Sequence, residues 1–195
     1  RTDYTEPRQH QSAKYRHKDY HREEEAMEGK KTNIDAAQQA RIRAVQMEMN
    51  DYKALIRADE GFKAKAYKPQ AKEKHMTIGY GHYGADVKKG STITRERAEE
   101  LLDKDVRDRM VSIRGLMTEF DYLPLDLKRA IFSEHYRGSV QQSPKTIELI
   151  NAGEWADASL EFLDNKQYKN AEALKIPGIK PRMERVSKEL MKLAQ

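Results

Sequence analysis

A glutamate followed by a glycine-rich segment is the arrangement in this sequence best suited to chemistry. Glu60 lies on the last turn of a predicted helix, directly before Gly61, where unpaired backbone carbonyls disfavour a negative charge. Partial burial would raise the pKa of such a carboxyl further, so that it could donate a proton to a glycosidic oxygen near neutral pH. Residues 77–84 carry three glycines, which is typical of a strand that another chain approaches closely. A solvated glutamate beside a tight hairpin is the competing interpretation.

The elements that must position these residues are mainly helical. Apolar residues recur at steps of three and four in a stretch that starts at Thr32 or Asn33 and stops at Gly61, which predicts a long helix. Its apolar stripe consists of Ile42, Val45, Met49, Tyr52 and Ile56. Later helices are predicted from the N-cap Thr94 to 117, over 127–138, from Ser143-Pro144 to Gly153, over 155–163 and over 181–193.

Composition excludes several classes of protein. The 195 residues contain no cysteine, so disulfides and thiolate metal sites are excluded. No apolar run approaches the roughly 20 residues that span a bilayer, so we expect no stable membrane insertion. No signal peptide is visible, although the sequence starts at Arg1 and a removed segment stays possible. The histidines lack ligand spacing, and neither a metal nor a cofactor is expected. The net charge of +5 favours anionic partners in general.

The chain divides by composition into three parts. Residues 1–31 form a charged extension, whose first 30 residues contain no Val, Ile, Leu, Phe or Trp. Such a segment cannot bury enough apolar surface to offset its ordering entropy, so we expect it to be disordered or ordered only against a partner. Residues 32–49 are interpreted as a helical linker, and residues 50–195 as a folded domain.

Several motifs in the proposed domain resemble a known family. Glu-Gly-Phe-x4-Tyr at 60–67 and Thr-Ile-Gly-Tyr-Gly-His at 77–82 are similar to the active-site region of the phage-type lysozymes, glycoside hydrolase family 24. Further similar stretches follow in the family's order, so that the resemblance covers about residues 50–193. It implies an α+β, mainly helical, two-lobed lysozyme-like fold. A small antiparallel sheet would lie in one lobe, and a long helix would link it to a larger helical lobe.

The family's catalytic set is a glutamate, an aspartate nine residues later and a threonine after six more. Glu60 and Thr77 match the first and third, but position 69 is Pro69 and no aspartate lies between Glu60 and Thr77. Glu73, the only acid in that interval, is the candidate for the second carboxylate, on a loop two residues longer than usual. With Glu73 in that role, the resemblance implies an inverting muramidase that hydrolyses the β-1,4 bond between N-acetylmuramic acid and N-acetylglucosamine. Without it, either Glu60 and Thr77 would act without a carboxylate base, or the domain would bind glycan without cutting it.

Four further side chains are candidates for substrate binding: Tyr80, His82, Glu134 and His135. His82 also fits a structural hydrogen-bonding role. The Glu134-His135 pair stands where family members usually carry apolar or amide residues, which suggests an altered subsite or a solvated pair. Arg182 and Arg185 are expected to form ion pairs with carboxylates of the domain.

The extension suggests a virion-associated enzyme. We expect it to dock to another virion protein, in a tail or among ejected proteins, and the domain to act on peptidoglycan in the host periplasm or cell wall. An endolysin with a basic tail is the alternative, and a structural or glycan-binding virion protein is a second one. Binding of nucleic acid is not expected, because the acidic run 23–25 opposes it.

Overall fold

The computed structural model describes residues 13–70 and 73–195, with side chains from Asp35 onward. Its first helix, α1, spans Ala13–Glu60. The chain divides after Met47 into a first unit, of which the structure describes only the N-terminal part of α1, and a second unit, Glu48–Gln195. The first twelve residues of the predicted extension lie outside the described residues, and the division at 31 and 49 stays a prediction.

Helix α1 begins earlier than the sequence predicted. It starts at Ala13 and not near Thr32. The prediction relied on an apolar stripe, which residues 13–31 lack. A helix does not need such a stripe, because Ala, Lys, Arg and Glu have favourable intrinsic helix propensities and no Pro or Gly occurs between Pro7 and Gly29.

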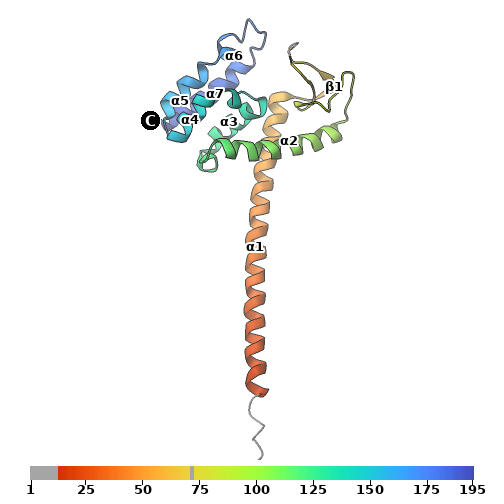
Figure 1. Ribbon diagram of the computed structural model, residues 1–195, viewed down its shortest axis with the longest axis vertical. Helices are drawn as coiled ribbons and strands as arrows, with labels where there is room; N and C mark the ends of the chain where they lie inside the picture. The colour runs from red at the N-terminus through yellow and green to blue at the C-terminus, as the bar shows by residue number, and fades with distance from the viewer. Residues whose placement is uncertain (1–12, 71–72) are drawn as a thin grey trace, which may run out of the picture. The chain divides into compact units, whose positions relative to one another are not determined.

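The second unit has the predicted α+β, mainly helical, lysozyme-like architecture (Figure 1). The long helix α2, Arg95–Leu116, contacts the sheet through β2 and β3 and the helical group through α3, so that it links the two lobes. The helical lobe contains α3 Leu125–Arg137, α4 Pro144–Ala152, α5 Trp155–Leu163, α6 Lys166–Lys169 and α7 Ile179–Leu193, with short 3-10 turns at Phe120–Tyr122 and Val140–Gln142. None of the described helices is long and apolar enough to span a bilayer.

The small lobe carries a three-stranded antiparallel sheet in the order β1-β2-β3. Strands β2, Met76–Gly79, and β3, His82–Gly84, form the hairpin that the glycine-rich segment predicted. Strand β1, Lys63–Tyr67, was not predicted, because Lys and Ala, which make up four of its five residues, are depleted in strands. Thr77 pairs with Tyr67 on one side and with Tyr83 on the other, which places it in the central strand.

Local signals set several helix ends as predicted. The Thr94 hydroxyl accepts a hydrogen bond from the Arg97 N–H at 3.2 Å and caps α2. Pro144 is the first residue of α4, where its missing N–H costs nothing. Helix α1 ends at Glu60 because Gly61 adopts a left-handed conformation, with φ of 65°. Gly61 therefore places Glu60 on the last turn of α1.

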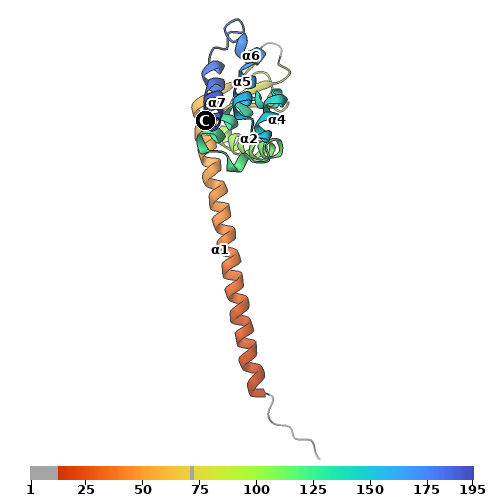
Figure 2. The same cartoon turned by 90° about the vertical axis from the view of Figure 1, so that its left-hand side faces the viewer.

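The core lies among the helices of the second unit. Helix α7 packs against α5 and α3, and both views show α5 beside α7 (Figure 2). From the predicted stripe of α1, Met49, Tyr52 and Ile56 are buried in this core. Ile42 and Val45 are more than half exposed, which corrects the prediction for them, because they precede the second unit.

Ion pairs fix the end of α1 on its neighbours in the second unit. Arg57 donates two hydrogen bonds to Glu99 of α2, at 2.8 and 2.6 Å. Two turns earlier, Glu48 lies 2.7 Å from Nη2 of Arg114, near the other end of α2. These two contacts attach α1 to both ends of α2 and set the direction of the helix that carries Glu60.

Tyr52 provides the first test of this arrangement. It is 1% exposed and stacks on Phe132 of α3 with ring centroids 3.9 Å apart. Tyr52→Ala should lower the free energy of unfolding by roughly 3–5 kcal/mol, because it removes a buried aromatic and leaves a cavity. Urea denaturation measures this loss. Tyr122→Ala is the control: that side chain is 84% exposed, and its loss should stay within about 0.5 kcal/mol. Equal losses of unfolding free energy in the two variants would contradict the proposal that Tyr52 fixes α1 in the core.

Candidate active site

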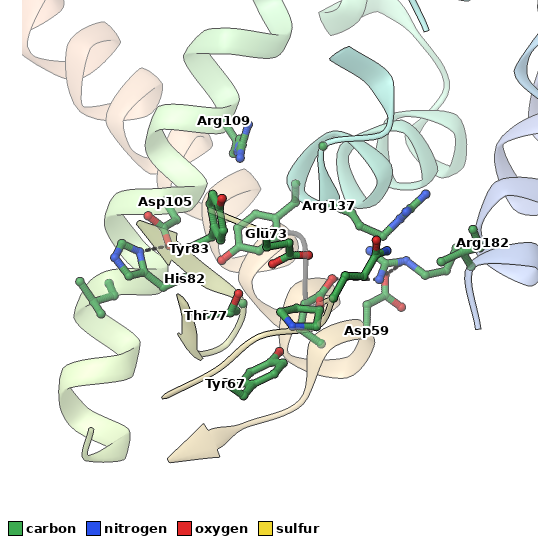
Figure 3. Close-up of a pocket in the computed structure, with 18 of the residues that line it drawn as sticks. Asp59, Tyr67, Glu73, Thr77, His82, Tyr83, Asp105, Arg109, Arg137 and Arg182 are labelled. Carbon is green, nitrogen blue, oxygen red and sulfur yellow. Dashed lines mark hydrogen bonds and ion pairs between the residues drawn. The ribbon is translucent and has the colours of Figure 1, made fainter. Parts of the chain in front are cut away.

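A cleft of about 1410 Å³ separates the sheet from the helical lobe. Of the residues predicted to act in catalysis, it brings together all three: Glu60, Glu73 and Thr77. His82 also lines it. Figure 3 shows Thr77, Tyr67 and His82 on the side of the sheet and α2, with Asp59 and Arg182 on the side of the helical lobe. The cleft therefore runs between the two lobes, as the lysozyme resemblance implied.

Arg182 of α7 fixes Glu60. Its Nη1 donates a hydrogen bond to Oε1 of Glu60 at 2.9 Å, and the Glu60 side chain is only 21% exposed. The same guanidinium donates from Nη2 to the carbonyl and the hydroxyl of Ser133, at 3.0 and 2.9 Å. Arg185 lies 3.9 Å from Asp59. The predicted pairing of Arg182 and Arg185 with carboxylates of the domain is therefore confirmed.

Glu73 and Glu60 both act electrostatically on Tyr67, which lines the same cleft. The pKa of Tyr67 is raised, first by burial and then by the negative charges of Glu60 and Glu73. Both carboxylates therefore lie near one phenol in the cleft. Glu73 is half-buried on the loop after Gln70, whose carbonyl accepts a hydrogen bond from the Glu73 N–H at 3.1 Å. The Lys68 ammonium donates a hydrogen bond to the Glu73 backbone carbonyl at 2.7 Å.

The chain passes very close to Glu60 at Gly81. This glycine has φ of 88° and lines the cleft between β2 and β3. A Cβ atom added there would lie 3.4 Å from Cγ of Glu60 and 3.3 Å from the ring of Tyr136. Tyr136 in turn donates a hydrogen bond from its hydroxyl to the Tyr80 carbonyl at 3.0 Å. The glycine at position 81 thus allows the backbone of the hairpin to approach the carboxyl, whereas the predicted approach of a sugar chain stays a prediction.

His82 bridges the hairpin and α2. Its Nδ1 lies 2.8 Å from Oδ2 of Asp105, and its Nε2 lies 3.0 Å from Oδ2 of Asp86. The hydrogen bonds to Asp105 and Asp86 outweigh the effect of burial and raise the pKa of His82 to about 9. The imidazolium in turn lowers the pKa of Asp86. At neutral pH His82 is therefore a cation that ties β3 to α2, which supports the structural role considered for it.

Three residues proposed for substrate binding lie outside the cleft. Tyr80 is buried in the core and packs against Phe62, with ring centroids 5.5 Å apart. Glu134 and His135 are both 0% exposed, and neither lines the cleft. A direct contact of these three side chains with a sugar is therefore not supported. The sequence alone could not tell whether these side chains face the cleft or the core.

Several residues that line the cleft were not predicted from the sequence. Asp59, next to Glu60, accepts a hydrogen bond from the Ser133 hydroxyl at 2.5 Å, so it holds the wall of the cleft. Arg109 of α2 and Arg137 of α3 line the cleft with positive charge (Figure 3). Adjacency to the glutamate could have indicated Asp59. The two arginines belong to separate helices, and no spacing in the sequence connects them.

The cleft is lined by both acidic and basic side chains rather than by a compact group of metal ligands. Among the residues that the structure describes, no three or more His, Asp or Glu side chains are placed to hold a metal ion. The chemistry that these residues can perform is proton transfer and hydrogen bonding to a bound chain of sugars. Two separated carboxylates in one groove suit glycoside hydrolysis.

The fold, with a cleft between its two lobes, places this chain in the lysozyme-like fold class. The muramidase domain of SpmX from Asticaccaulis excentricus has this fold, with a TM-score of 0.50 and 19% identity. The likeness covers 74% of this chain and 95% of that domain. At this level of identity it bears on the fold alone.

The sequence is also similar to curated phage endolysins and matches a protein family. The endolysin of Bacillus phage B103 is 36% identical over 115 residues, which are 56% of this chain and 41% of the relative. The endolysin of Bacillus phage PZA is 35% identical over 114 residues, 55% of this chain and 42% of the relative. The chain thus spans about two fifths of the length of these relatives. Residues 57–185 match the family Phage lysozyme. The chain belongs to the phage lysozyme family.

The His82 bridge predicts how stability depends on pH. Because folding raises the pKa of His82 from 6.5 to about 9, its contribution is complete below pH 6.5 and is lost as the pH rises through 9. The difference in unfolding free energy between the wild type and His82→Gln should therefore shrink by on the order of 1–2 kcal/mol from pH 6 to pH 10, allowing for solvent screening. Urea titrations at both pH values measure it. Asp86→Asn, at an exposed partner, should show a smaller change; a pH-independent difference for His82→Gln would refute the bridge.

Proposed function

We propose that this chain hydrolyses peptidoglycan at the β-1,4 bond between N-acetylmuramic acid and N-acetylglucosamine. The observation that carries the proposal is the position of Glu60, held by Arg182 on one wall of the cleft, with Thr77 and Glu73 lining the same cleft. Membership of the phage lysozyme family and the endolysin names of its relatives support it.

In this proposal the carboxyl groups of Glu60 and Glu73 have different catalytic roles. Glu60 donates its proton to the glycosidic oxygen as the bond to the leaving sugar breaks. Glu73, with the Thr77 hydroxyl, orients a water molecule on the opposite face of the ring and takes up its proton as the new C–O bond forms. Inversion at the anomeric carbon follows from attack on that opposite face. The shared effect of both carboxylates on Tyr67 supports placing Glu73 at the same site as Glu60.

The second candidate is a glycan-binding domain without hydrolytic activity. The observation that favours it is the absence of any aspartate between Glu60 and Thr77, where the family resemblance expects one. In that case the cleft would still hold a sugar chain, but no carboxylate would activate the water. Turbidity of a suspension of purified peptidoglycan separates the two functions, because only hydrolysis clears it.

For the biological role, we propose a virion-associated lysozyme that acts on the host cell wall and docks to another virion protein through its N-terminal extension. The support is the charged segment ahead of the domain, which contains no large aliphatic side chain before residue 34 except Met27. An endolysin that acts at the end of infection is the alternative, and the names of the relatives favour it. Mass spectrometry of purified particles distinguishes the two, since only the first places the chain in the virion.

Glu60→Gln should abolish hydrolysis and leave the fold intact. The amide has nearly the same shape and can still accept a hydrogen bond from Arg182, but it cannot donate a proton as an acid. We expect the rate of peptidoglycan clearing to fall by at least 10³-fold, with a thermal unfolding midpoint close to that of the wild type. Clearing at a rate near that of the wild type would disprove the role of Glu60.

Glu73→Gln tests the replacement of the missing aspartate. If Glu73 orients the water, the rate should fall by at least about 100-fold, within the usual contribution of a general base. Glu172→Gln is the matched control, since its side chain is 81% exposed and lies outside the cleft. A loss below threefold for Glu73→Gln would mean that its charge is not used in the reaction.

A further inference from the structure

A fully buried carboxylate lies beneath the cleft, between two arginines. Glu134 of α3 is 0% exposed. Its Oε2 accepts hydrogen bonds from Nη2 of Arg137 at 2.5 Å and from the Ser139 hydroxyl at 2.6 Å. Its Oε1 lies 3.3 Å from Nε of Arg182. Burying a charge is costly unless it is paired, and Glu134 is paired with two guanidinium groups.

One of these guanidinium groups is also the partner of Glu60. Arg182 contacts three carboxylates: Oε1 of Glu60 at 2.9 Å, Glu134 at 3.3 Å and Oδ2 of Asp59 at 3.8 Å. Arg182 is itself only 12% exposed, so water screens these contacts weakly. A change in the charge of Glu134 therefore affects Glu60 through Arg182, which contacts both carboxylates.

The cluster is close to balanced in charge. Its ionisable members come from α1, α3 and α7: Asp59, Glu60, Glu134, Arg137, Arg182 and Arg185. From α6, the Gln167 side chain accepts a hydrogen bond from Arg137 at 2.9 Å and adds no charge. His135, the next residue on α3, stays neutral at working pH, because burial and the charge of Arg109 on α2 lower its pKa to about 4. Three carboxylates thus face three guanidinium groups.

We propose that Glu134 is a positioning residue that offsets the charge of Arg182, so that Arg182 holds the Glu60 carboxyl in place without committing it to the carboxylate form. The inference rests on the proposed role of Glu60 as the acid. A catalytic acid must carry its proton before each turnover, and an uncompensated guanidinium 2.9 Å away favours the ionised form. Glu134 supplies the opposing charge, 3.3 Å from Nε of Arg182.

The test is the pH dependence of kcat/KM for peptidoglycan hydrolysis in Glu134→Gln. The amide keeps the shape of the side chain and removes its charge. Arg182 then stabilises ionised Glu60 more strongly, and the alkaline limb of the profile should move to lower pH by roughly one unit. Glu134→Asp, which retains the charge, should keep the limb at the wild-type pH.

Ser139→Ala is the matched structural control. It removes the hydroxyl that binds the same Glu134 oxygen, and it leaves every charge of the cluster unchanged. We expect it to lower the thermal unfolding midpoint without moving the pH profile. A purely structural role for Glu134 predicts that Glu134→Gln behaves in the same way, with lower stability and an unmoved limb, and that result would overturn the proposal.

Two further variants keep the outcome decisive. If Glu134→Gln does not fold, the double variant E134Q/R137Q replaces the buried ion pair with two neutral amides, and it should fold and show the same acidic shift, because Arg182 still lacks its counter-charge. An unshifted limb there also overturns the proposal. Glu60→Gln separates the two hypotheses. If that variant is active, the proposed function fails; if it is inactive while the Glu134→Gln profile is unmoved, only the role of Glu134 fails.

Discussion

The ion pair between Glu60 and Arg182 is the contact on which the geometry of the site depends. It joins the last residue of α1 to the first turns of α7, across 122 positions in the sequence. Such a pair stabilises a structure only when its geometry is good and its remaining donors are satisfied. Here Ser133 accepts from the other terminal nitrogen, whereas Nε makes no hydrogen bond to a described residue and has only the charges of Glu134 at 3.3 Å and Asp59 at 3.8 Å beside it. The packing of α7 therefore sets the position of the carboxyl.

The opposite wall of the cleft is set by different contacts. Protonated His82 holds the β2–β3 hairpin against Asp105 of α2, and the backbone at Gly81 passes so near Glu60 that a Cβ atom there would be in contact with its side chain. Neither contact relies on a large apolar core in the small lobe, where β2 and β3 of the three-stranded sheet pack against α2. Where the two walls of the cleft meet, the His82–Asp105 ion pair and the side-chain-free Gly81 thus take the place of hydrophobic packing. Both leave the cleft open to a polar ligand.

Local signals in the sequence predicted much of this structure. Gly61, Thr94 and Pro144 act through their own backbone or a neighbouring N–H, so their effects can be inferred from a few residues. Predictions of burial for single side chains were less successful. Tyr80 and Glu134 stand in or near recognisable motifs, but their exposure depends on which elements cover them. The pairing of Arg182 with Glu60 also joins distant segments, and only its chemical type, an arginine with a carboxylate, could be inferred from the sequence.

The location of Arg182 on the last helix has a consequence for how activity arises during folding. Contacts between distant segments form late, because the loop between them must close first. A chain in which α7 has not yet docked contains the sheet, α2 and Glu60, but no guanidinium beside the glutamate. The same chain lacks the buried faces of Met183, Val186 and Leu190 that complete the core. The arrangement of Glu60 and Arg182 in the cleft is thus coupled to the docking of α7 and to completion of the core.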